Sequence, residues 1–154
     1  MYPFEIKFTR IIDKLYEQNK VKYLLETARE LIAMYRIDNF SNKKNKLSFK
    51  NCFFRFRVIF GLMDSINYGS VEVFETEKHT IGVTYTVSLM RFWFQIILIT
   101  LVLLVTTQQR TTTMAVCILI GAAGWIYNVL RHRWFLKVIV SWMEKSGKKE
   151  FQHY

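Results

Sequence analysis

The chain has 154 residues, of which 22 are Lys or Arg and 12 are Asp or Glu, so its formal net charge is +10. This length leaves room for one small folded module of about 90 residues beside two apolar segments. Of the two cysteines, Cys52 is expected in the cytoplasm and Cys117 in the membrane, so no disulfide is expected, and their spacing gives no zinc site.

Residues 1–88 are predicted to form a cytoplasmic α+β module. The opening residues lack the charged n-region and the apolar h-region of a secretory signal peptide. A weaker apolar stripe around Ile11 and Leu15 predicts a first amphipathic helix, and basic residues at 42–46 predict a loop. The stripe that predicts a second amphipathic helix, over 20–36, has helical spacing: Leu24, Leu25, Ala28, Leu31, Ile32 and Tyr35.

The pattern then changes to alternation of period two, which is typical of strands. It predicts a three-stranded antiparallel meander over 52–60, 71–74 and 81–88, with the helix at 20–36 covering its apolar face. Arg55 and Arg57 alternate with phenylalanines, as cations and aromatics do on RNA-binding sheets. We prefer a role beside anionic lipid headgroups and expect no nucleic-acid partner.

Two apolar runs, residues 89–105 and 114–130, are joined by a short polar loop. Together, as 89–130, they predict a transmembrane hairpin, because backbone groups in lipid must be satisfied within helices. Each run is about 25 Å long as a helix, near the lower limit for a bilayer core of about 30 Å. A soluble protein with two buried core helices is the alternative, but the remaining chain is too charged and too short to cover them.

Charge predicts the orientation of the hairpin. The flanks carry net charges of +5 (residues 1–91) and +4 (131–154), whereas the loop holds only Arg110. Both termini are therefore expected on the cytoplasmic side of a bacterial inner membrane, or the matrix side of a mitochondrial one. The residues expected to anchor the hairpin at the membrane interface are basic or aromatic: Arg91, Trp93, Trp125, Arg131, Arg133 and Trp134.

Small residues in the second run share one helical face. Cys117, Gly121, Gly124 and Asn128 follow at i, i+4, i+7 and i+11. Small residues let helices approach closely, and an amide adds an interhelical hydrogen bond. This face is predicted to pack against another membrane helix. A transport pathway is not expected, because neither run contains an ionisable group in its core.

The tail, residues 131–154, is predicted to be a basic amphipathic helix. Its apolar positions recur at helical spacing: Trp134, Phe135, Val138, Ile139, Trp142 and Met143. Such a helix can lie in the headgroup layer. Alternatively, it continues the second run and packs on the sheet module, and the pattern favours neither arrangement.

No nucleophile–base pair, metal-ligand spacing or phosphate-binding loop is found, so no catalytic residue, metal or cofactor is predicted. His79, in a predicted turn, is interpreted as a surface residue. We expect a non-catalytic accessory subunit of an inner-membrane complex, with anionic lipid and other membrane subunits or a second copy as partners. One alternative is an effector that oligomerises into a pore. A weaker one is a membrane-bound enzyme that uses carboxylates not singled out by any motif.

Overall fold

The structure is a computed structural model of the chain, and it describes residues 4–15, 18–35, 37, 39–51 and 66–149. The described residues form eight elements: β1 (Glu5–Leu15), α1 (Gln18–Ala33), β2 (Asn39–Lys43), β3 (Lys46–Lys50), β4 (Tyr68–Glu75), β5 (Thr80–Ser88), α2 (Met90–Thr106) and α3 (Arg110–Lys149).

The five strands form one antiparallel sheet in the order β1-β5-β4-β3-β2. Because side chains alternate along a strand, paired residues point to the same face of the sheet. Phe8, Tyr85, Val71 and Leu47 are cross-strand neighbours, one each from β1, β5, β4 and β3. This row therefore belongs to a continuous apolar face.

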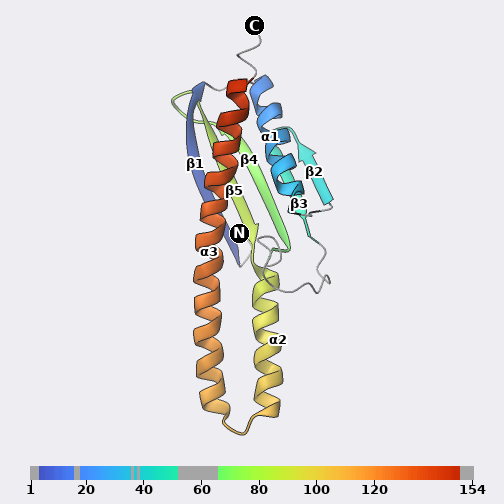
Figure 1. Cartoon of the computed structure of the whole chain (residues 1–154), viewed down its shortest axis with the longest axis vertical. Coiled ribbons are helices and arrows are strands. Elements are labelled where there is room, and N and C mark those ends of the chain that lie inside the picture. The colour runs from blue at the N-terminus through green and yellow to red at the C-terminus, as the bar shows by residue number, and fades with distance from the viewer. Residues whose placement is uncertain (1–3, 16–17, 36, 38, 52–65, 150–154) are drawn as a thin grey trace.

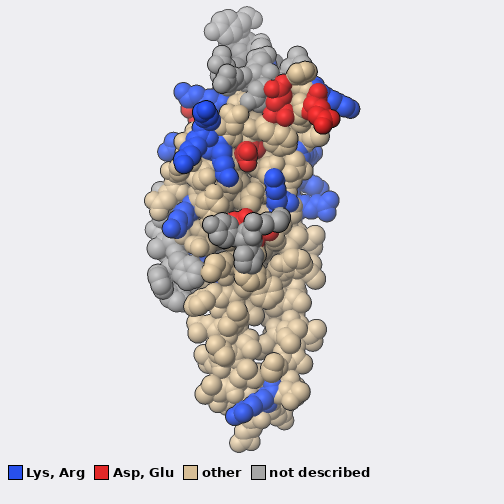
Figure 2. Space-filling model, turned by 180° about the vertical axis from the view of Figure 1, so that it is seen from behind, with Lys and Arg blue, Asp and Glu red and all other residues tan. Residues whose placement is uncertain are grey.

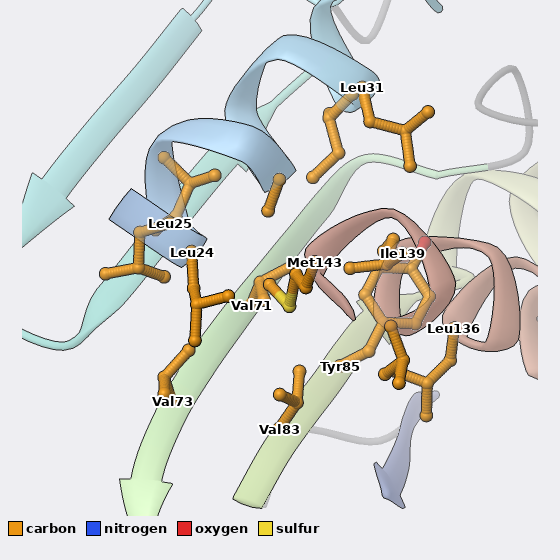
Figure 3. Close-up of a cluster of buried hydrophobic side chains, with 14 of the residues drawn as sticks. Leu24, Leu25, Leu31, Val71, Val73, Val83, Tyr85, Leu136, Ile139 and Met143 are labelled. Atoms are coloured by element: carbon orange, nitrogen blue, oxygen red, sulfur yellow. The ribbon is translucent and has the colours of Figure 1, made fainter. Parts of the chain in front are cut away.

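α1 and the end of α3 lie side by side over that apolar face (Figure 1). Their buried side chains interdigitate with those of the sheet (Figure 3). Tyr85 is fully buried, with the rings of Phe8, Phe49 and Phe135 at centroid distances of 5.7 to 6.4 Å. Burying one large apolar side chain contributes about 1.5–3 kcal/mol. The hydrophobic core of the described residues lies between the sheet and these two helices.

The other part of the molecule is a stem, defined here as α2 together with residues 110–130 of α3. The two helices leave the sheet side by side and are joined at 107–109 (Figure 1). α3 is one helix of 40 residues, about 60 Å long at 1.5 Å per residue. It therefore serves both the stem and the sheet domain.

The predicted three-stranded meander is wrong, because the described residues form a sheet of five strands. The strand predicted at 52–60, with Arg55 and Arg57, lies outside the described residues. β1 occupies the position of the predicted first helix. Ile11 and Leu15 fit helical spacing, but the alternation of Ile6 and Phe8 with polar neighbours matches the register of β5, and this long-range pairing decides the structure.

The basic loop predicted at 42–46 contains the turn of the β2–β3 hairpin at residues 44 and 45, and its other residues belong to the two strands. Lys44 adopts a left-handed backbone conformation with φ 44°, which allows the chain to reverse there. Only Phe40, Leu47 and Phe49 carry the apolar pattern of these two strands. The edge strand is otherwise polar and exposed, so its composition resembles that of a loop.

The predicted transmembrane hairpin, with spans at 89–105 and 114–130, is also wrong. α3 is the one described helix that is long and apolar enough to cross a membrane. α2 has 17 residues and falls short of that length. No separate amphipathic helix follows the second apolar run either. α3 continues without a break, and Phe135, Ile139 and Met143 from its end are fully buried against the sheet.

Candidate functional site: an apolar stem below a sheet domain

The stem exposes apolar side chains around most of its surface. In the most apolar 18-residue window of α3, 17% of the residues are buried. The lower half of the molecule shows almost no charge, whereas acidic and basic groups crowd the sheet domain (Figure 2). Arg110 is the only charged residue between positions 92 and 130. An exposed apolar surface of this extent is typical of contact with lipid or with another apolar protein surface. Its large exposed members in α3 are Met114, Val116, Ile118, Leu119, Ile120, Trp125, Ile126, Tyr127 and Leu130.

The threonine hydroxyls of α2 donate hydrogen bonds to carbonyl groups of their own helix. Thr100 donates to the carbonyl oxygen of Ile96 at 2.7 Å, and Thr106 donates to that of Val102 at 3.0 Å. At the tip, the hydroxyls of Thr107 and Thr113 lie 3.0 Å apart and link the two helices. A hydroxyl that bonds to the carbonyl four residues back needs no water, which suits a helix surrounded by lipid.

The structure places the predicted small-residue face against α2. Cys117 and Asn128 are buried, and the Asn128 amide donates to the carbonyl oxygen of Gly124 at 2.9 Å. A Cβ atom added at Gly121 would lie 3.4 Å from Ile96, and one added at Gly124 only 2.9 Å from the ring of Phe92. Helix–helix contact inside the chain therefore occupies this face.

The predicted interface anchors occupy different environments. Trp125, Arg133 and Trp134 are exposed, and the half-buried Arg131 has its guanidinium 5.8 Å from the centre of the Tyr127 ring. These four residues lie in α3 in and just above the upper end of the stem.

The two anchors predicted in α2 are less accessible. Arg91 is 4% exposed, so the structure places it inside the domain–stem junction. Trp93 is half-buried, with its ring centroid 6.1 Å from that of Phe4 and 5.6 Å from that of Phe92.

A buried polar pair joins the sheet to α3 just above the stem. The Tyr85 hydroxyl and Nδ1 of His132 lie 3.2 Å apart, and both side chains are fully buried. Nε2 of His132 has no hydrogen-bond partner in the described part of the chain. Burial, with a smaller contribution from the charge of Arg131, lowers the pKa of His132 to about 4, and burial raises the pKa of Tyr85.

Sequence reasoning missed this pair. His132 stands between Arg131 and Arg133, which made it resemble an interface residue. Its spacing of three, four and seven residues from Phe135, Leu136 and Ile139 places it on the buried face of the same helix, and that spacing is the signal that could have found it.

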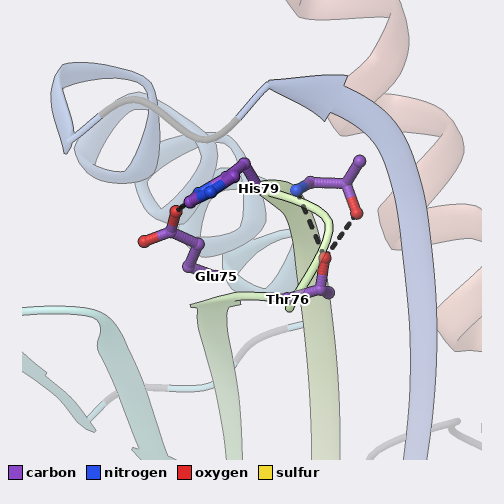
Figure 4. A network of polar contacts seen from close by, with 4 residues as sticks. Glu75, Thr76 and His79 are labelled. Carbon is purple, nitrogen blue, oxygen red and sulfur yellow. Dashed lines mark hydrogen bonds and ion pairs between the residues drawn. The ribbon is translucent and has the colours of Figure 1, made fainter.

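Glu75, Thr76 and His79 form a group of polar contacts at the turn between β4 and β5. Nδ1 of His79 lies 2.5 Å from Glu75, and Thr76 accepts a hydrogen bond from the backbone of Thr80 at 3.2 Å (Figure 4). His79 adopts a φ of 55° at the β4–β5 turn, and its side chain is exposed. Among the described residues, no group of three His, Cys, Asp or Glu side chains could hold a metal ion.

Comparison of the chain with protein-family models, with curated proteins and with solved structures finds no match.

Proposed function

We propose that this chain is a membrane-anchored, non-catalytic subunit in which α3 crosses a lipid bilayer with α2 packed against it, and in which the sheet domain is presented to partner proteins at the membrane surface. The observation that carries the proposal is the exposed apolar stem. Most of its large apolar side chains are exposed, as those of a helix in lipid are, while Gly121 and Gly124 of α3 contact α2 and Thr100 bonds within its own helix.

The dimensions agree with this placement. Residues 110–130 of α3 are about 31 Å long as a helix, which matches a hydrocarbon core of about 30 Å. α2 is about 26 Å long and packs along that part of α3 as a shorter companion. The exposed Arg133 and Trp134 then lie at the headgroup layer, where cations and tryptophans are enriched.

Charge supports the orientation. Most cations belong to the sheet domain and the flanks, and the tip of the stem carries only Arg110. The domain is therefore proposed to face the cytoplasm of a bacterial cell, or the mitochondrial matrix. Anionic headgroups would contact the basic residues near the junction, each with about 1 kcal/mol of attraction.

The oligomeric pore has less support. The small-residue face that would have let copies of α3 approach one another is already occupied by α2. Between positions 92 and 130, only Arg110 could offer a charge to a water-filled lumen.

The test is expression of the tagged chain, alkaline extraction of membranes, and native purification in mild detergent with identification of each co-eluting protein. We expect the chain to resist alkaline extraction and to elute with stoichiometric partners. Release by alkali would overturn the anchoring. A homo-oligomer that makes liposomes leak would favour the pore.

A further inference from the structure

The face of the sheet opposite α1 and α3 contains an open groove of about 880 Å³. This volume lies within the range of about 300–1,000 Å³ that small-molecule sites occupy. The groove crosses β1, β5, β4 and β3, and its lower end is formed by Phe4 and by Met90, the first residue of α2. It therefore begins where the stem begins.

Charges of both signs line this groove. Lys7 and Lys46 supply two cations, and Glu5 and Glu72 supply two carboxylates. In the described part of the chain, these four side chains make no ion pair with one another. A ligand with a net negative charge would be attracted by the lysines but repelled by the glutamates. The balanced set instead complements a zwitterion.

The charges are arranged in rows across the strands. Lys7 is paired with Thr86, which is paired with Ser70, so one cation and two hydroxyls form a row suited to a phosphate group. Glu72 lies two residues beyond Ser70 along β4, away from the stem, in a row with Lys46. A carboxylate there is positioned for an ammonium group farther from the membrane than the phosphate.

An exposed apolar stripe continues from the lower end of the groove along α2. Met90, Phe94, Ile97 and Leu101 follow at i, i+4, i+7 and i+11, and each is more than half exposed. Residues at this spacing share one helix face. A molecule with its polar head in the groove could therefore lay an acyl chain along this stripe.

We propose that the groove binds the headgroup of a zwitterionic aminophospholipid, phosphatidylethanolamine, with its phosphate at the Lys7–Thr86–Ser70 row and its ammonium at Glu72. This site rests on the proposed membrane placement of the stem. The occupant is a lipid rather than a soluble zwitterion because the groove opens directly onto the apolar stripe of α2.

The test reconstitutes the full chain in phosphatidylcholine nanodiscs that contain small equal amounts of phosphatidylethanolamine and phosphatidylglycerol. Native mass spectrometry then counts the lipids retained after release. We expect the wild type to retain phosphatidylethanolamine in preference to phosphatidylglycerol. Glu72→Lys should lower that preference about tenfold, which corresponds to about 1.4 kcal/mol, and should raise retention of phosphatidylglycerol.

A matched charge reversal outside the groove serves as the control. Glu26→Lys on α1 changes an exposed residue on the other side of the sheet and should leave the lipid preference unchanged. A general loss of folding would lower retention of both lipids, so the exchange of preference identifies the groove.

Equal retention of the two lipids by the wild type, or equal effects of groove and control variants, would overturn the site. A photoreactive group at Ser88 that crosslinks to a protein instead of a lipid would also overturn it and would indicate a peptide occupant. If the chain fails to enter nanodiscs at all, the membrane placement itself is wrong, and the site falls with it.

Discussion

The sheet domain and the stem use the same kinds of apolar residue in opposite ways. In the domain, α1 buries Leu25 and Ile32 and exposes Lys22, Glu26 and other charged residues. In the stem, α2 exposes its large apolar side chains, and the contact between the helices includes small residues of α3. Under the proposed membrane placement, the difference follows from two solvents, because the exposed side chains of a helix match its surroundings.

α3 shows both behaviours in one helix. Between positions 114 and 130, its exposed side chains are apolar or aromatic, as at Ile118 and Leu119. Beyond position 130, the exposed side chains include Arg133 and Lys137, and the buried ones belong to the domain core. The change of solvent is thus marked within about one helical turn, and mutations on either side of it should have opposite consequences.

The largest effect is expected from an interior position of the domain. Phe135→Ala removes a fully buried ring that contacts the rings of Tyr85 and Tyr35. The variant should lose about 3–5 kcal/mol of unfolding free energy, measured by denaturation in mild detergent. Trp134→Ala is the matched control, because that neighbouring side chain is mostly exposed and should change stability little. Equal losses for both variants would refute the assigned core.

A charge on the outer surface of the stem should prevent membrane insertion instead of unfolding the domain. Leu119→Arg places a cation near the middle of residues 110–130, at a side chain that is 70% exposed. The cost is about 2.5–3.5 kcal/mol for an arginine at the centre of a span. Membrane fractionation should show less of the variant in the bilayer, whereas Leu119→Ile should behave as the wild type. An unchanged amount of Leu119→Arg in the membrane fraction would show that this surface of the stem does not face lipid.

The junction should make the stability of the sheet domain sensitive to acid. The pKa of His132 is lowered to about 4 in the fold, so the unfolded chain takes up this proton first as the pH falls below about 6.5. Stability is therefore present above pH 6.5 and is lost as the pH falls toward 4, by roughly 3 kcal/mol in total.

Denaturation of the wild type and of His132→Gln at several pH values separates this effect from that of the carboxylates. The variant should show a shallower loss of stability between pH 6.5 and 4. Parallel curves for the two proteins would mean that His132 does not titrate differently on folding.

The smallest effect is expected at the contact between the helices of the stem. Gly124→Leu would push a side chain into the ring of Phe92, which already lies 2.9 Å from the position of an added Cβ atom. Overpacking costs about 1–3 kcal/mol. The exposed neighbour Ala123 provides the control, since Ala123→Leu should be tolerated. Disulfide crosslinking between α2 and α3 would measure the separation, and equal crosslinking of both variants would argue against this contact.

Sequence patterns located the parts of the chain whose structure is decided locally. α2 and the first half of α3 overlap the two apolar runs, because uniform apolarity is visible in the composition itself. α1 overlaps the amphipathic helix predicted at 20–36 for a similar reason, since its apolar residues all pack against the same neighbouring layer. Cys117 and Asn128 shared a face by spacing alone, although spacing could not show that α2 would cover it.

The parts that were missed depend on contacts between distant residues. β1 becomes a strand by pairing Phe8 with Tyr85, 77 positions later, and no local window contains that information. β2 is an edge strand whose mostly polar side chains face water, so it lacks the alternation of apolar and polar residues that predicts a strand. The contact of His132 with Tyr85 likewise exists only once α3 has docked on the sheet.

The unbroken course of α3 has a mechanical consequence. The only proline of the chain is Pro3, so none interrupts the 40 residues of α3. One stiff helix therefore runs from the tip of the stem to the end of the sheet that is farthest from the stem (Figure 1). In a bilayer thinner than the stem, such a helix accommodates the mismatch by tilting. Because Phe135, Ile139 and Met143 fix its upper end to the sheet, the domain must tilt with it. Membrane thickness would thus set the angle at which the sheet domain meets whatever lies beside it.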